Sequence, residues 1–368
     1  MVGLVAKGES HVTIAEVRCT RLTTPLHSPF VTALRRATNL ETTVVELVDS
    51  DGQRGFGEAP QAWRVTGESL AGAEACLSGP LADVVRGRSP DDLLELTRGV
   101  ADAVTGNHGA KAAMDVALHD LAARRAGLSL PRFLGTSNHQ VATDVTVSAG
   151  ALEQLTADAE TRVAEGFDVL KVKVGGEAAA DVARIRAVRR AVGPEVRIRV
   201  DANQGWTPRD AIRVILALED AGVDLELVEQ PVAAADLAGL ARVTAAVATP
   251  VMADESVFSL RDLTELIRLR AADLVNVKLA KCGGLTAAVS LLETARAHGV
   301  GTIVGSMMEG PIGVGAAASL VAAYPTTCIS DLDAAWWVAT SPVEGGLSYG
   351  AGTVVLPDLP GLGISRLS

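Results

Sequence analysis

Apolar runs and helical patterns alternate along the chain from about residue 141 onward. The helical stretches carry an apolar stripe, as from Val182 to Val192, and Thr207 before a proline and Ser259 with Asp262 have the pattern of helix N-termini. Eight β-branched runs lie between the helices: ATDVTVS, DVLKVKV, EVRIRVD, LELVEQP, PVMADES, DLVNVKL, GTIVGS and TTCISDLD. Strands that alternate with helices predict a parallel sheet, and eight of them predict a closed barrel.

The first third of the chain has a different pattern. Apolar and polar residues alternate between Thr42 and Ala59 around Asp51-Gly52, which predicts an antiparallel hairpin, and a helical stretch follows at Gly106–Gly127. We therefore predict a disordered segment over residues 1–12 and an α+β domain over 13–135. The barrel is expected over 136–338, and the Gly- and Pro-rich segment 339–368 is expected to return to the first domain.

Composition and charge narrow the class of protein. The chain has 368 residues, of which 48% are hydrophobic and 21% charged, as in globular proteins. A net charge of −11 argues against a nucleic-acid partner, and the longest nearly apolar run, 311–325, is too short to span a bilayer. The four cysteines form no C-x-x-C pair and no signal peptide is evident. We expect a cytoplasmic homo-oligomer with reduced thiols and no membrane partner.

Five successive predicted strands end in an ionisable residue: Lys173, Asp201, Glu229, Asp254 and Lys278. By subtraction of these numbers, the gaps are 28, 28, 25 and 24 residues, each about one strand–helix unit. The catalytic groups of such barrels lie at the carboxyl ends of the strands. The five side chains are therefore predicted to share one site.

Asp201, Glu229 and Asp254 come from consecutive strands and offer the oxygen ligands that suit Mg²⁺. No histidine lies at a strand end, which disfavours zinc or iron. The alternative for each single acid is an ion pair with arginine or lysine at the barrel mouth. Three acids in register favour a magnesium site.

Lys173 and Lys278 end the second and sixth predicted strands, which face each other across an eight-stranded ring. Two amines on opposite sides of one carbon can remove a proton and return it from the far side, so the site suits racemisation or epimerisation beside a metal-bound carboxylate. Lys171 shares a strand face with Lys173, and like charges disfavour each other. We expect Lys173 to act as the base and Lys171 to tune it. The alternative is a solvated strand edge.

Strand parity directs further polar residues inward. Arg199 and Asn203 share a face with Asp201, and Asn276 shares one with Lys278. We expect these side chains to orient the ligands and the lysines. A structural polar layer in the barrel floor is the alternative.

Together these residues resemble the enolase superfamily in its muconate-lactonising branch. The resemblance covers nearly the whole chain and rests on K-x-K, D-A-N-Q-G-W, E-Q-P, A-D-E-S, N-V-K and P-G-L-G-I. It implies an α/β protein, a modified (β/α)7β TIM barrel with an α+β capping domain. It also implies that Lys173 and Lys278 are the acid/base pair and that the three carboxylates bind Mg²⁺. The histidine–aspartate dyad of the mandelate-racemase branch is absent.

Asp331 and Asp333 lie two apart at the predicted barrel mouth, where two carboxylates suit a substrate ammonium group. This D-x-D resembles the feature with which dipeptide epimerases hold the free α-amino group. The loop SPFVTALRRATNLE resembles their substrate lid, in which Arg35 matches an arginine that contacts glutamate in L-Ala-D/L-Glu epimerases. Arg36 beside it is a candidate solvated charge, and Thr146 completes the expected substrate-binding set.

The segment GSMMEGPIG follows the seventh predicted strand. Met307, Met308 and Glu309 are expected to bind substrate, because methionine adapts to varied shapes; ordinary packing is the alternative. Gly310-Pro311 stands where relatives commonly carry a polar or basic residue, which leaves the side-chain specificity open. The segment WRVTGESL, residues 63–70, is expected to form a second lid.

The sequence thus predicts a Mg²⁺-dependent isomerase that epimerises dipeptides at the α-carbon of the C-terminal residue, with L-Ala-D/L-Glu as the favoured substrate. N-acylamino-acid racemase, o-succinylbenzoate synthase and cycloisomerase are alternatives on the same fold, and their substrates lack a free amino group. A non-catalytic binding protein would not need both lysines and all three carboxylates together.

Overall fold

The structure is a computed structural model that describes residues 12–31, 36–148 and 150–368. The segment predicted to be disordered therefore lies outside the described residues except for Val12, and so does Arg35. In the described part of the chain, no helix is both long enough and apolar enough to cross a membrane.

The cap is the part built from β1 to β3 and α1 to α4. Its sheet is antiparallel, in the order β1 (Ile14–Val31), β2 (Arg36–Asp49) and β3 (Arg54–Pro60). The predicted hairpin is confirmed, because Val48 pairs with Arg54 across a turn in which Gly52 has a φ of +83°. The helices are α1 (Leu70–Ser78), α2 (Pro80–Val85), α3 (Leu93–Asp102) and α4 (His108–Arg125).

Helix α4 lies unusually close to strand β3. A Cβ on Gly57 would stand 1.8 Å from the backbone oxygen of Ala113, so only glycine lets the two elements approach this far. Val45 and Leu47 of the sheet pack with Ala113 and other buried residues of the helices into one apolar core. This close contact fixes the cap sheet on the helix that also borders the barrel.

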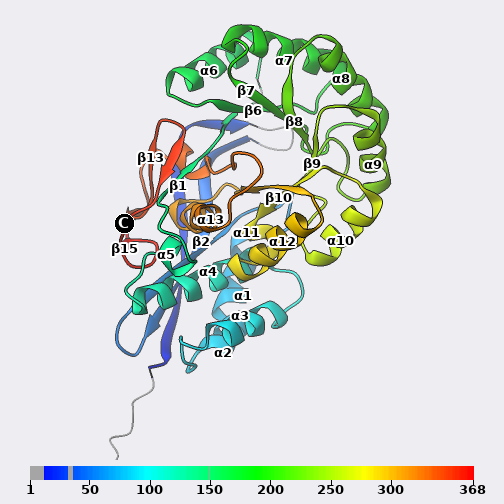
Figure 1. The fold of residues 1–368 in the computed structure, drawn as a ribbon. Coiled ribbons are helices and arrows are strands. Elements are labelled where there is room, and N and C mark those ends of the chain that lie inside the picture. Colours follow the sequence, from blue (N-terminus) through cyan, green and yellow to red (C-terminus); the bar gives the residue numbers. More distant parts are fainter. Residues whose placement is uncertain (1–11, 32–35, 149) are drawn as a thin grey trace, which may run out of the picture.

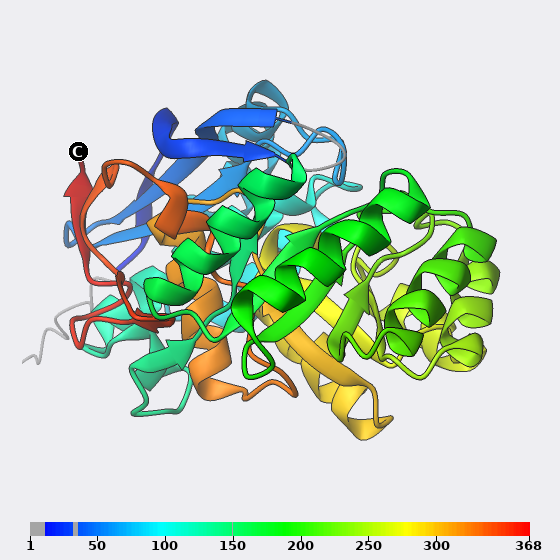
Figure 2. The ribbon, with the colours of Figure 1, turned by 90° about the horizontal axis from the view of Figure 1, so that it is seen from above.

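The barrel has seven parallel strands in the order β5 to β11, ringed by helices (Figures 1 and 2). The strands are β5 (Val145–Val147), β6 (Val169–Lys173), β7 (Arg197–Asp201), β8 (Leu225–Glu229), β9 (Val251–Ala253), β10 (Leu274–Lys278) and β11 (Gly301–Gly305). The helices are α6 (Leu152–Ala164), α7 (Ala178–Val192), α8 (Pro208–Asp220), α9 (Leu237–Ala246), α10 (Leu260–Leu269), α11 (Leu279–Cys282), α12 (Leu285–Ala297) and α13 (Pro311–Ala323). The predicted capped barrel is confirmed.

The eighth predicted strand, TTCISDLD, is the exception. It makes only single bridges, Thr143 with Ser330 and Gly305 with Asp331. The backbone N–H of Leu332 donates to the hydroxyl of Thr143 instead of a strand carbonyl, and the chain then enters the 3₁₀ helix η1 (Ala334–Trp337). The ring is thus closed by isolated bridges, and backbone N–H groups of this segment and of β11 donate to side-chain hydroxyls where a ladder would use carbonyls.

The last segment of the chain lies against the cap and the start of the barrel (Figure 1). Strand β12 (Val343–Gly345) pairs with β15 (Ile364–Leu367), and β13 (Ser348–Gly350) pairs with β14 (Thr353–Val355), which pairs with β4 (Gln140–Ala142). The backbone of Gly361 exchanges hydrogen bonds with Leu128 and with Leu130, which begins α5 (Leu130–Phe133). The domain limits given above stay a prediction.

Candidate active site

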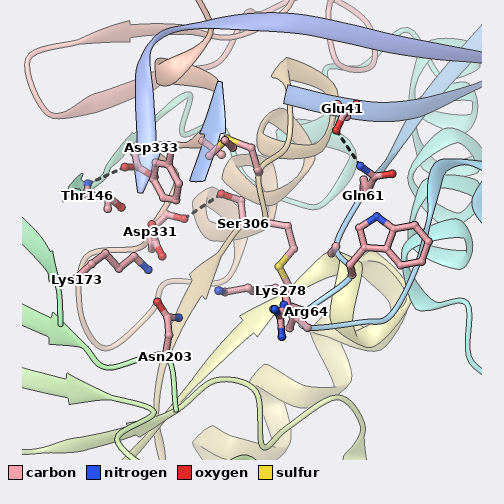
Figure 3. A pocket seen from close by; sticks show the side chains of 18 of the residues that line it. Glu41, Gln61, Arg64, Thr146, Lys173, Asn203, Lys278, Ser306, Asp331 and Asp333 are labelled. Carbon is pink, nitrogen blue, oxygen red and sulfur yellow. Dashed lines mark hydrogen bonds between the residues drawn. The ribbon is translucent and has the colours of Figure 1, made fainter. Parts of the chain in front are cut away.

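A cavity of about 480 Å³ lies where the cap meets the carboxyl ends of the barrel strands (Figure 3). The cap lines it with residues of β1, β2 and the turn after β3. The barrel lines it with residues of β5, β6 and β10 and of the segments that follow β7, β9 and β11. The cavity therefore lies at the end of the barrel where strand-end chemistry is expected.

The strand register places the predicted site residues in layers. Lys173 pairs with Asp201, and Asp201 pairs with Glu229, so these three share the top layer of adjacent strands. Lys171 pairs with Arg199 one layer below. Figure 3 shows the side chains of Lys173 and Lys278 entering the cavity from opposite sides, with their nitrogens facing each other.

Each of the cavity lysines is paired with a carboxylate. Lys173 Nζ lies 2.6 Å from an oxygen of Asp201, and Lys278 Nζ lies 2.8 Å from an oxygen of Asp254. Lys171 Nζ lies within 3.2 Å of three carboxylates, at 2.6 Å from Glu229, 2.7 Å from Asp331 and 3.2 Å from Asp201. The cluster is an ion-pair network on consecutive strands.

Burial and charge act in opposite directions on these groups. Burial lowers the pKa of Lys171, but the carboxylates of Asp331 and Glu229 outweigh it and hold that pKa well above its ordinary value. Burial raises the pKa of Asp254, but Lys278 and the other lysines hold it far below the usual range. Lys171 is therefore a counter-ion to several acids, and not only the like-charged neighbour of Lys173 that strand parity indicates. Its tuning role stays a prediction on that different basis.

The donor set suits a magnesium ion by its chemistry. Asp201, Glu229 and Asp254 are buried carboxylates, and Glu229 Oε2 and Asp254 Oδ1 have no hydrogen-bond partner, although lysine nitrogens lie 2.6 Å away. Among the described residues, no group of three Asp, Glu, His or Cys side chains has the arrangement of a formed metal site. Each of the three carboxylates is instead ion-paired with a lysine. Carboxylate oxygens are the hard ligands that Mg²⁺ prefers, so the chemistry of these three side chains fits this ion.

The predicted supporting residues have two different surroundings. Asn276 donates to Glu229 Oε1 at 3.0 Å, and Asn203 donates from its backbone to Asp201 Oδ1 at 2.8 Å, so both hold a carboxylate. Arg199 instead pairs with the acids Asp144 and Glu226 and donates to the carbonyl of Ile329. The contacts of Arg199 are those of a polar layer in the barrel floor.

Two buried charged residues of the site were missed from the sequence. Lys281, in α11, is 1% exposed, lies 2.6 Å from Asp254 Oδ1 and donates to the carbonyls of Asp254 and Asn276. Glu255 lines the cavity, and burial together with the charge of Asp254 raises its pKa to about 8. Two sequence features could have indicated them: the K-x-x-K spacing that begins at the end of β10 for Lys281, and the adjacent acids of A-D-E-S for Glu255.

Asp331, Asp333 and Thr146 lie together at one side of the cavity (Figure 3). Asp333 Oδ2 accepts hydrogen bonds from the backbone of Thr146 at 2.7 Å and from the indole of Trp337 at 3.0 Å. Asp331 is held by Lys171. The two carboxylates are thus fixed from several elements and give this side of the cavity an acidic character.

The segment after β11 divides between the cavity and the interior. Met307 and Met308 line the cavity, and Met308 also packs with Leu26 and Phe30 of the cap. Glu309 is not among the residues that line the cavity; its side chain is buried, and its carboxylate accepts from the backbone of Met307 at 2.8 Å. The expected contact of Glu309 with substrate therefore has no support in this placement.

The fold and the site define a capped barrel enzyme with two opposed lysines beside three strand-end carboxylates. The family model for the mandelate racemase/muconate lactonizing enzyme N-terminal domain matches residues 14–135, and the enolase C-terminal domain-like model matches residues 154–366. The chain belongs to the mandelate racemase/muconate lactonizing enzyme family of the enolase superfamily, as its motifs predicted.

Several relatives are similar over their full length. The L-Ala-D/L-Glu epimerase of Bacillus subtilis (strain 168) is 42% identical over 95% of this chain and 96% of its own. The solved structure of a substrate-liganded complex of the L-Ala-D/L-Glu epimerase from Bacillus subtilis has a TM-score of 0.94 at 41% identity, covering 97% of this chain and 99% of that chain. A dipeptide epimerase from Enterococcus faecalis V583, complexed with Mg and L-Leu-L-Tyr, has a TM-score of 0.92 at 37% identity, covering 96% and 100%.

Proposed function

We propose that this protein is a Mg²⁺-dependent dipeptide epimerase that inverts the α-carbon of the C-terminal residue, with L-Ala-D/L-Glu as its favoured substrate. The observation that carries the proposal is the approach of Lys173 and Lys278 from opposite sides of one cavity. The similarity to epimerases of such dipeptides over nearly the whole chain supports the same reaction.

The reaction is a proton transfer between two amines. One of the two lysines, as a free amine, takes the proton from the α-carbon, so that a C–H bond breaks and an N–H bond forms. The other, as an ammonium group, gives a proton to the opposite face of that carbon. Asp201, Glu229 and Asp254 would hold Mg²⁺, which would supply positive charge to stabilise the negative charge that develops when the proton leaves. Asn276 and Asn203 keep two of those carboxylates in place.

Asp331 and Asp333 bind the free ammonium group of the dipeptide. Both carboxylates are buried at one side of the cavity, where charge-assisted hydrogen bonds to an ammonium group are strong. With this role, the two aspartates favour dipeptides over N-acyl compounds, which have no free ammonium group. This role therefore distinguishes the epimerase from the racemase, synthase and cycloisomerase alternatives.

The test uses the full chain with Mg²⁺ and a dipeptide library in D₂O. Mass spectrometry is expected to find deuterium at the α-carbon of the C-terminal residue of L-Ala-L-Glu and its epimer. Asp331→Asn and Asp333→Asn are expected to raise KM for the dipeptide about tenfold or more and to change KM for an N-acyl amino acid little. Absence of exchange in every library member would refute the function.

A homo-oligomeric state and a cytoplasmic location complete the proposal. Both come from the sequence analysis, and the small-molecule substrate requires neither a membrane nor a nucleic acid. Size-exclusion chromatography with light scattering tests the oligomeric state, and a monomeric mass would contradict it.

A further inference from the structure

The two aspartates at the acidic side of the cavity are held by different kinds of partner. Asp331 is bound by the ammonium group of Lys171. Asp333 Oδ2 instead accepts from two neutral donors, the backbone of Thr146 at 2.7 Å and the indole of Trp337 at 3.0 Å (Figure 3). Neither of these donors binds Oδ1 of Asp333, and Asp333 lines the cavity. The protein thus fixes one oxygen and leaves the other for a group in the cavity.

The contact between Trp337 and Asp333 follows from the local backbone. Asp333 precedes the 3₁₀ helix η1, and the N–H of Trp336 donates to the carbonyl of Asp333 at 2.9 Å. This tight turn brings the side chain of Trp337 back to the carboxylate that precedes the helix. Trp337 is 2% exposed and is not among the residues that line the cavity. The indole therefore holds Asp333 from the protein side, away from the substrate.

The cap and the barrel both hold this indole. The ring of His27, in β1, stacks on the ring of Trp337 with the centroids 5.2 Å apart and an angle of 12° between the planes. Phe30 of the same strand lies nearly perpendicular to it at 5.3 Å, and the guanidinium group of Arg162, in α6, lies 5.5 Å from it. Such contacts restrict the orientation of an aromatic ring. The direction of the indole N–H is thus set by side chains of the cap and of the barrel.

The same hydrogen bonds act on the charge of Asp333. Burial and the charge of Asp331 raise the pKa of Asp333, whereas the hydrogen bonds from Trp337 and Thr146 act to lower it. An ammonium group binds an ionised carboxylate more strongly than a neutral one. The indole N–H therefore favours the form of Asp333 that a substrate ammonium group requires.

We propose that Trp337 is a positioning residue that aims Asp333 at the free ammonium group of the dipeptide, and that His27 and Phe30 of the cap keep its indole in this orientation. The inference rests on the proposed function and extends it to a residue that does not touch the substrate. A hydrogen bond that served only to satisfy a buried indole would affect stability and leave substrate binding unchanged.

The test separates the N–H group of Trp337 from the bulk of its side chain. Trp337→Phe in the full-length enzyme with Mg²⁺ is expected to raise KM for L-Ala-L-Glu about three- to tenfold and to change kcat less than about twofold, because the ammonium group is remote from the reacting carbon. A second variant carries benzothienylalanine at this position, an analogue with sulfur in place of the indole N–H. It keeps the packing of the two fused rings if Trp337→Phe folds poorly, and the same rise in KM is expected.

Trp336→Phe is the matched control, because Trp336 lies in the same aromatic group, 4.6 Å from the ring of His27, and is not a donor to Asp333. Its KM should stay within about twofold of wild type. In an Asp333→Asn background, Trp337→Phe should raise KM by less than about twofold further, since both changes act through one side chain.

Three results would overturn the inference: an unchanged KM in both Trp337 variants, an equal rise in Trp336→Phe, or full additivity of Trp337→Phe with Asp333→Asn. A wild-type enzyme that epimerises no dipeptide would refute the proposed function together with this inference. An active wild-type enzyme with any of the three results would refute this inference alone.

Discussion

At the scale of single residues, the site is a network in which buried lysines are ion-paired with buried carboxylates. In the ion-pair network, four buried lysines lie beside four buried acids, so their formal charges cancel; Glu255 and Asp333 are further buried acids outside this network. The lysines are Lys171, Lys173, Lys278 and Lys281, and the acids are Asp201, Glu229, Asp254 and Asp331. Removing one partner from such a cluster leaves an uncompensated charge in a medium that solvates it poorly.

Lys281 offers a test of this balance that is independent of catalysis. Lys281→Met removes an ion-pair partner of Asp254 Oδ1 and the donor to two buried carbonyl oxygens, so the free energy of unfolding is expected to fall by about 3 kcal/mol. Urea unfolding without divalent ions measures the loss. Arg268→Met, which removes an exposed ion pair with Glu265, should stay within about 0.5 kcal/mol of wild type. Comparable values for the two variants would show that Lys281 does not balance the site.

At the scale of elements, the N-terminus of α13 shows how the cap stabilises the barrel. The N-cap residue of this helix is Gly310, which offers no side chain. Glu58 of β3 supplies the missing acceptor, taking hydrogen bonds from the backbone of Gly310 at 2.9 Å and of Gly313 at 3.0 Å. A carboxylate at a helix N-terminus also has favourable electrostatics, so a cap strand completes a barrel helix.

Glu309 beside this helix end gives a pH prediction. Burial, and then the charge of Glu58, raise the pKa of Glu309 to about 7, against the opposing charge of Lys278. Because the folded-state pKa lies above the unfolded value, the protonated form favours folding, and this contribution is lost as pH rises from about 4.5 through 7.

Glu309→Gln stays neutral and keeps an oxygen for the backbone of Met307. Its stability relative to wild type should therefore rise by about 2 kcal/mol between pH 5 and pH 7.5. Urea unfolding of both proteins at the two pH values measures this difference. A difference that does not vary with pH would mean that Glu309 titrates normally.

At the scale of the whole molecule, helix α4 connects the cap, the barrel and the last segment of the chain through hydrogen bonds. Asp115 accepts from the backbone of Leu285 at 2.6 Å, at the first turn of barrel helix α12. One turn further on, Asp120 accepts from Phe56 of the cap sheet at 2.8 Å and from Leu362 of the last segment at 2.7 Å. A single helix thus ties the cap, the barrel and the end of the chain together through two buried carboxylates.

Asp120→Ala is expected to lower the free energy of unfolding by about 3 kcal/mol. The change leaves two buried N–H groups without an acceptor and Arg124 without its ion pair. Chemical denaturation measures the loss. Asp91→Ala is the control, because Asp91 is largely exposed where it meets Arg125 and should cost less than about 1 kcal/mol. An effect of Asp120→Ala as small as that of the control would contradict the role of α4 as a tie.

The sequence predicted the elements well where a pattern repeats over neighbouring residues. The stripe from Val182 to Val192 is helix α7, Thr207 caps α8, and Ser259 with Asp262 forms a capping box. Each of these depends on contacts between residues a few positions apart, which the order of the chain exposes directly. The prediction of a regular eighth strand was wrong. The backbone N–H of Leu332 donates to the side chain of Thr143, which is far away in the sequence, and no local pattern indicates this contact.

The sequence by itself determined the capped barrel and the strand ends on which the lysines and carboxylates stand, since hydrophobic period and strand–helix spacing are local properties. Only the tertiary structure decided which charges pair. It surrounded Lys171 with acids, turned Glu309 away from the cavity and brought Lys281 to Asp254. Such pairings join side chains from different strands, and their strength depends on burial and distance, which no local pattern encodes.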